Sequence, residues 1–63
     1  MNTAATDERL RLRFIQTLNE LNDDERARLL SLETEVELRT LFALALASGF
    51  TSVAASIEVA AAQ

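Results

Sequence analysis

Apolar residues recur at helical spacing in four stretches of the chain, and short polar segments separate them. The first stretch places four apolar residues three or four positions apart, on one face of a helix: Leu10, Phe14, Leu18 and Leu21. This spacing predicts a helix over 7–21 with Thr6 as its N-cap. Residues 1–5 are polar or small, and we expect them to be disordered.

Two polar segments predict helix breaks. Asn22 precedes three acidic residues, and Glu25 stands where its side chain can return to the Asn22 amide in a capping box. The sequence Thr34-Glu35-Val36-Glu37 has the standard Thr-x-x-Glu form of the same motif. These signals predict a second helix over 23–33 and a third over 35–48.

The third helix contains Leu41–Ala47, which is apolar on every face. Gly49, the single glycine, follows it and can adopt the left-handed conformation that ends helices. Thr51 or Ser52 can cap a last helix over 52–61, within a small-residue apolar tail, 52–63. One copy can cover only part of Leu41–Ala47, so we expect a patch of Leu44 or Ala43 with Ala47 to be exposed.

The chain is therefore expected to be all-α, a bundle of three to four short helices forming a single domain over 6–63. Leu and Ala supply 22 of the 63 residues, and there is no Pro. A chain of this length buries only about 60% of its unfolded surface. We therefore expect the bundle to be completed by self-association or by a partner.

Charge and composition exclude several function classes. The net charge is −4 and all six basic residues are Arg, without a basic stripe, which argues against nucleic-acid binding. The absence of His, Cys and Lys removes the usual bases, nucleophiles and metal ligands, so we expect no enzyme activity and no cofactor. The absence of Cys also fits a cytoplasmic protein.

The charged residues end abruptly, since fifteen of the sixteen lie before residue 41. The segment Leu41–Val59 approaches the roughly 20 residues that cross a bilayer. Ser48-Gly49 and Thr51-Ser52 interrupt it, and no basic residue follows it. A membrane span is therefore the least favoured interpretation.

A longer pattern runs through the chain: Phe14-Ile15, the acidic step at Asn22–Glu25, Leu29, a Leu/Ala helix ending Ala47-Ser48-Gly49-Phe50, and a Thr/Ser-capped tail. This pattern resembles the leader-peptide family associated with nitrogen-fixation operons, which includes the leaders of prochlorosin-type modified peptides. The resemblance covers about residues 10–60. It implies a helical docking portion that a peptide-modifying enzyme binds, with Phe14, Leu18 and Phe50 as docking positions.

Two departures from that family stand out. No glycine follows Gly49, so the Gly-Gly or Gly-Ala processing site is missing, and there is no Cys. The chain could be a stand-alone relative, or Ser52–Gln63 could itself be the substrate. Apolar spacing alone allows the docking residues to seal the domain's own core instead.

Two functional hypotheses follow. The first is a non-catalytic helical protein-binding module resembling the leader of a peptide precursor, and the second is a small structural or regulatory subunit that acts as a helical homo-oligomer. Six residues are the candidates for partner binding: Leu10, Phe14, Leu18, Phe42, Leu44 and Phe50.

Overall fold

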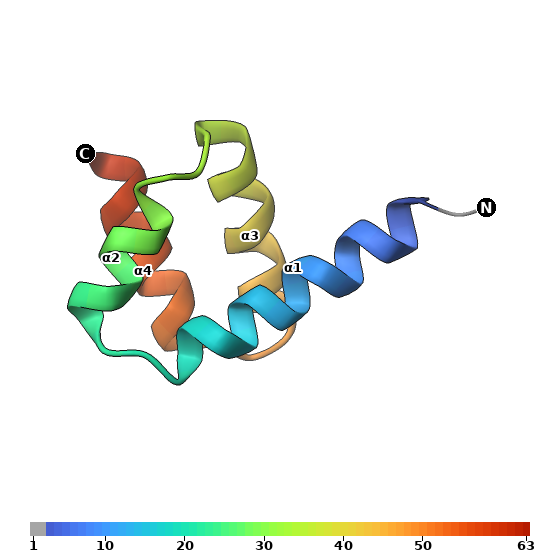
Figure 1. The fold of residues 1–63 in the computed structure, drawn as a ribbon, viewed down its shortest axis with the longest axis horizontal. Helices are drawn as coiled ribbons and strands as arrows, with labels where there is room; N and C mark the ends of the chain where they lie inside the picture. The colour runs from blue at the N-terminus through green and yellow to red at the C-terminus, as the bar shows by residue number, and fades with distance from the viewer. Residues whose placement is uncertain (1–2) are drawn as a thin grey trace.

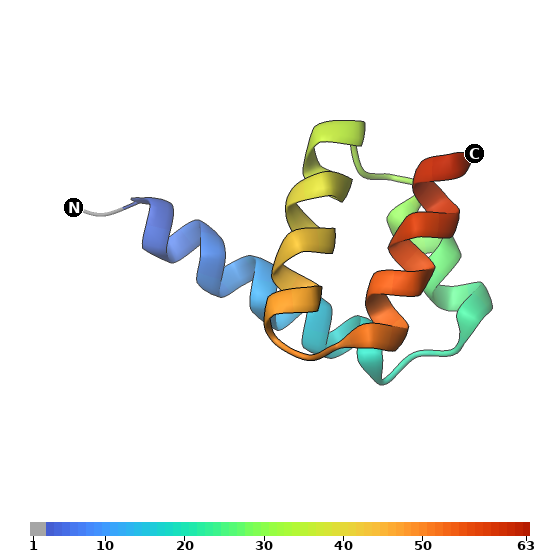
Figure 2. The same cartoon turned by 180° about the vertical axis from the view of Figure 1, so that it is seen from behind.

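The computed structural model describes the backbone of residues 3–63 and the side chains of residues 7–63. Its four helices are α1 Thr3–Asn19, α2 Asp23–Leu30, α3 Glu35–Ala47 and α4 Thr51–Ala62. The expected all-α bundle and its three breaks are confirmed. Figures 1 and 2 show α2, α3 and α4 grouped together, with the N-terminal half of α1 extending beyond them.

Helix ends differ from the predicted boundaries by a few residues. Residues 1–2 of the segment expected to be disordered lie outside the described residues, whereas α1 already begins at Thr3, so Thr6 lies inside the helix. At the other end, the N–H groups of Glu20 and Leu21 bond to carbonyls three residues back, at 3.0 and 3.1 Å. This tighter turn ends α1 at Asn19, before the predicted residue 21.

The two predicted capping boxes have different outcomes. At α2, Asn22 Oδ1 accepts from the Glu25 N–H at 2.9 Å, and Glu25 Oε1 accepts from the Asn22 N–H at 3.2 Å. At α3, Thr34 Oγ1 accepts from the Glu37 N–H at 3.1 Å. The Glu37 carboxylate does not return to Thr34, because Arg11 on α1 binds it. The second box is therefore only half formed.

Gly49 ends α3 as predicted. Its φ is +84°, and two hydrogen bonds surround it: Phe50 N–H to Ala45 O at 2.8 Å and Gly49 N–H to Leu46 O at 3.2 Å. This is the Schellman arrangement. The expectation that Thr51 or Ser52 caps the last helix is wrong, since α4 begins at Thr51 with Phe50 as N-cap and no side-chain cap bond.

The break at Gly49 also divides the apolar segment 41–59 between α3 and α4. Among the described residues, no helix is both long enough and apolar enough to cross a bilayer.

Every helix contributes to one hydrophobic core. The fully or almost fully buried members are Ile15 and Leu18 from α1, Leu30 from α2, Leu38, Leu41 and Ala45 from α3, and Val53, Ala54 and Ile57 from α4. In α4, Val53 and Ile57 are both buried, one turn apart on the same face. In α2, by contrast, Ala27 is exposed, and Leu32 lies beyond the helix with most of its side chain in solvent. Both faces of α2 could be buried only if other helices lay on both sides of it.

Candidate functional site

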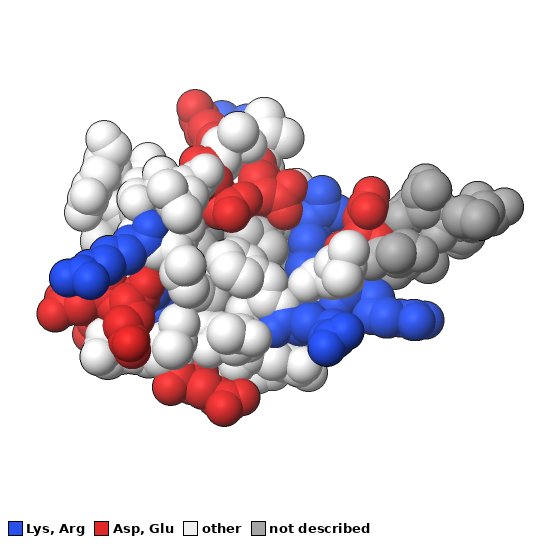
Figure 3. Space-filling view, in the orientation of Figure 1, with Lys and Arg blue, Asp and Glu red and all other residues white. Residues whose placement is uncertain are grey.

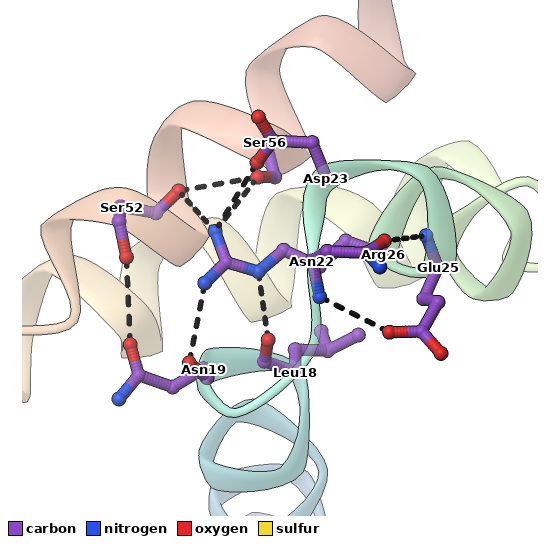
Figure 4. A network of polar contacts seen from close by, with 8 residues as sticks. All are labelled: Leu18, Asn19, Asn22, Asp23, Glu25, Arg26, Ser52 and Ser56. Atoms are coloured by element: carbon purple, nitrogen blue, oxygen red, sulfur yellow. Dashed lines mark hydrogen bonds and ion pairs between the residues drawn. The ribbon is translucent and has the colours of Figure 1, made fainter.

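Arg26 on α2 forms hydrogen bonds with residues of both α1 and α4 (Figure 4). Its Nε donates to Leu18 O at 2.7 Å, and its Nη2 donates to Asn19 O at 3.3 Å. Its Nη1 lies 3.4 Å from Ser52 O and 3.3 Å from Ser56 Oγ on α4. The guanidinium therefore closes the C-terminal end of α1, where the last carbonyls of a helix lack partners.

Sequence reasoning missed this role. Arg26 is the one charged side chain in the core region that is buried among the described residues. Its nearest carboxylate, Asp23, is 3.8 Å away and almost fully exposed. Its position four residues after Asn22, inside an exposed-looking acidic and basic run, carried no signal of burial. The burial of Arg26 depends on its contacts with Ser52 and Ser56 of α4, so only the tertiary structure could reveal it.

A second long-range contact ties α1 to α3. Arg11 Nε and Nη2 donate to the two carboxylate oxygens of Glu37, at 2.6 and 3.0 Å. This paired geometry is the strong form of an Arg–carboxylate contact. The hydrogen bonds from Arg11 lower the pKa of Glu37, and they raise the pKa of the Arg11 guanidinium. Arg11 therefore holds the two helices together.

The predicted docking stripe on α1 changes from buried to exposed along its length. Leu18 is 0% exposed in the core, Phe14 is half-buried against that core, and Leu10 is 58% exposed. Leu18 has no exposed surface in this fold, so its predicted docking role stays an untested prediction. Leu10 lies between Glu8 and Arg11, which line a groove with α3, but its own side chain is exposed.

The other predicted partner-binding residues are half-buried. Phe42, Leu44 and Phe50 all pack against the core cluster with part of each side chain accessible. Phe50 does so next to the Schellman turn that Gly49 forms. Leu10 is not among the partly buried hydrophobic residues that pack against the core with these three.

An exposed apolar strip lies instead on the side of α3 that faces away from the core. We call it the α3 outer face, and its residues are Val36, Ala43, Leu46 and Ala47. Leu46 is 50% exposed. The predicted patch is present: Ala43 and Ala47 are exposed, and half-buried Leu44 lines a shallow groove with them. Glu8 and Arg11 of α1 form the other side of this groove.

A larger groove runs between α2 and α4. Its volume is about 600 Å³, and small apolar side chains line most of it: Ala27, Ala55, Val59 and Ala60. Arg26 and Asp23 lie at one end, beside Ser52 and Ser56. We call this the α2/α4 groove.

Charges are unevenly placed around these surfaces. In Figure 3, several basic side chains lie over α1, and the acidic side chains over α2 have a basic one beside them; further acidic side chains lie over α1 and the start of α3. No cluster of three or more acidic side chains suited to a metal ion occurs in the described part of the chain. These surfaces therefore combine exposed apolar residues with charged residues at their edges, which suits contact with another molecule.

The chain matches no protein-family model, no curated protein and no solved structure in the comparisons.

Proposed function

We propose that this chain is a non-catalytic helical module that binds another protein through the end of α1. Residues 3–10, which we call the α1 extension, are helical; the start of this segment projects beyond the other three helices (Figure 1), and Glu8 lines a groove with α3. Leu10 in this extension is 58% exposed and continues the apolar stripe that Leu18 buries in the core. That continuation carries the proposal, because a helix stripe that runs past its own core is suited to a second surface.

The partner class follows from the resemblance to the leader-peptide family. A leader presents a folded helical portion to a peptide-modifying enzyme, which then acts elsewhere on the precursor. In this interpretation Leu10 is the accessible anchor, and Phe14, half-buried, is shared between the core and the partner. The complete Asn22 capping box and the Gly49 turn keep the bundle folded while α1 is engaged.

The experiment uses the peptide-modifying enzyme encoded nearest to this gene. Calorimetry measures the affinity of this enzyme for the wild type, for Leu10→Glu and for the control Val36→Glu, which changes a residue on α3 that is 71% exposed. We expect Leu10→Glu to weaken binding at least about tenfold, which is about 1.4 kcal/mol, and Val36→Glu to leave it unchanged. Equal affinity for all three proteins, each with native helicity, would remove the α1 extension as the binding element.

A second candidate function rests on the α3 outer face. Leu46 is half exposed there beside small residues that permit close helix approach. A small structural or regulatory subunit that self-associates would cover such a face. Leu46→Glu and Leu44→Glu distinguish the surfaces: if α3 forms the interface, the solution mass of Leu46→Glu falls to 6.9 kDa. A wild type that is a monomer at high concentration would contradict this alternative.

A further inference from the structure

Two groups in this fold are placed to bind the Glu37 carboxylate, and they exclude each other. The carboxylate accepts two hydrogen bonds from the Arg11 guanidinium, at 2.6 and 3.0 Å. Glu37 is also the third residue of α3 after the Thr34 N-cap, where a capping box turns the side chain back to the N-cap N–H. A carboxylate that is bound at both oxygens by a side chain of α1 cannot also lie against the start of its own helix.

The groups for the second contact are already in place. Thr34 Oγ1 accepts from the Glu37 N–H at 3.1 Å, whereas the Thr34 N–H donates to no group in the described part of the chain. The box at α2 shows the complete form, because there the Asn22 N–H donates to Glu25 Oε1 at 3.2 Å. Rotation of the Glu37 side chain would therefore complete the same motif at α3.

Few contacts hold the beginning of α1 against α3. The core cluster and the apolar side chains packed on it begin at Phe14 in α1. Among the described residues 7–13, the hydrogen bonds that reach another helix are the two from Arg11. The side chains of Arg11 and Glu37 are 32% and 28% exposed, so water and salt weaken the pair towards the strength of a capping bond. Two arrangements of similar stability are what a conformational switch requires.

We propose that Glu37 is a two-position switch between α1 and α3. In the closed position it binds Arg11 and holds the start of α1 against α3. In the open position the segment before Phe14 separates from α3, and Glu37 completes the Thr34 capping box. The bond to Thr34 offsets part of the loss of the Arg11 pair, so opening is less costly than breaking that pair without a replacement.

Opening changes the surface of α3. Glu8 and Arg11 form one side of the shallow groove, and Ala43, Leu44 and Ala47 belong to the other side. When the start of α1 leaves α3, the groove is lost and these three apolar side chains become more accessible. The switch therefore controls how much of this patch α1 covers. It is a property of the chain alone and does not rest on the proposed function.

The exchange of single amide protons with water tests the open position. NMR measures the rate for the Thr34 N–H and, as an internal reference, for the Asn22 N–H. In Arg11→Ala we expect the Thr34 N–H to exchange at least about threefold more slowly than in the wild type, because it gains the Glu37 bond. Destabilisation of the fold by Arg11→Ala would make exchange faster, so a slower rate identifies the new bond.

Two variants isolate the role of Glu37. Arg11→Ala/Glu37→Ala should return the Thr34 rate to the wild-type value, because the acceptor is gone. Arg13→Ala is the matched control and should not change the rate, since Arg13 is exposed on the same helix and pairs with no described side chain. If Arg11→Ala does not fold, the wild type in about 1 M salt decides the question, because screening weakens the Arg11 pair and should slow Thr34 exchange relative to Asn22.

A spin label tests the closed position. The sequence has no Cys, so Glu8→Cys provides a single labelling site. Because Glu8 lines the same groove as Ala43 and Ala47, the label should broaden the amide signals of these two alanines. Arg11→Ala in the labelled chain should weaken this broadening, and Arg13→Ala should leave it unchanged.

Either of two results would overturn the inference. The first is Thr34 exchange that is no slower in Arg11→Ala or in high salt than in the wild type, since Glu37 would then have no second position. The second is broadening at Ala43 and Ala47 that Arg11→Ala does not change, since Arg11 would then not hold the start of α1. The affinity of the modifying enzyme for Leu10→Glu tests the proposed function separately.

Discussion

Arg26 Nε lies 2.7 Å from Leu18 O, so a side chain of α2 closes the end of α1. The same guanidinium reaches Asn19 O and two oxygens of α4, so its hydrogen bonds join α2 to both α1 and α4. Its positive charge lies at the negative end of the α1 dipole, where a cation is stabilised. The turn between α1 and α2 is therefore held by a contact across the bundle as well as by its own caps.

Replacing Arg26 with Ala should destabilise the fold by about 2–4 kcal/mol, because it removes a buried side chain whose hydrogen bonds join α2 to α1 and α4. Chemical denaturation monitored by circular dichroism measures the change. Arg28→Ala on the same helix is the matched control, since Arg28 is exposed and should change stability by no more than about 0.5 kcal/mol. Arg26→Lys should recover only part of the loss, because an ammonium lacks the planar fork. Equal stability of the two alanine variants would contradict this role.

The Arg11–Glu37 pair should make stability depend on acid pH. Arg11 lowers the pKa of Glu37 in the folded chain, so the stabilisation is fully present above the unfolded glutamate pKa, about 4.3. It is lost as pH falls through the lowered folded pKa, because protonation removes the charge that Arg11 binds. Glu37→Gln should therefore reduce the melting temperature at pH 7 and have a much smaller effect at the lowest pH at which the wild type still folds.

Glu35→Gln is the control for that experiment. Glu35 pairs with Arg39 at 2.7 Å, but both side chains are 74% exposed. Such an i,i+4 pair contributes only about 0.3–0.5 kcal/mol, and salt screens it. A Glu37→Gln effect that is no larger, or that does not change with pH, would show that the contact between α1 and α3 is not stabilising.

Gly49→Val should cost about 1–2 kcal/mol through the backbone alone. Gly49 has φ +84°, and a Cβ built there would meet no atom within 4 Å. The penalty is therefore conformational and not steric crowding, so Gly49→Asn, which tolerates the left-handed region, should lose less. Thermal melts of the two variants measure the difference. Equal melting temperatures for Gly49→Val and wild type would remove the argument that Gly49 must be left-handed.

The stripe on α1 should respond to truncation according to position. Leu18→Ala removes a fully buried side chain and should cost about 2–5 kcal/mol, which is much of the stability of so small a domain. Leu10→Ala, at an exposed position, should change stability by no more than about 0.5 kcal/mol. Phe14→Ala should fall between them. Denaturation midpoints of the three variants provide the order, and a large loss for Leu10→Ala would mean that the α1 extension packs against the bundle.

Local interactions explain how much of the fold was predictable. The four helices, the complete capping box at Asn22, the Thr34 cap and the Gly49 turn all depend on groups within five residues of one another. Their geometry is set by the chain itself, so residue type and spacing identify them. Helix ends were less predictable, because a last turn can tighten without a change in sequence pattern.

The candidate site depended on residues far apart in the chain. Glu37 could bond to the Thr34 amide or to Arg11, 26 positions away, and only the packing of α1 on α3 selects Arg11. Likewise, Leu10 and Leu18 repeat the same apolar spacing, yet one is exposed and the other is buried, because the bundle covers only part of α1. Periodicity defines which face of a helix is apolar. The positions of the other helices decide how much of that face is covered, and they leave Leu10 exposed. The same packing places Arg26 where α1, α2 and α4 meet.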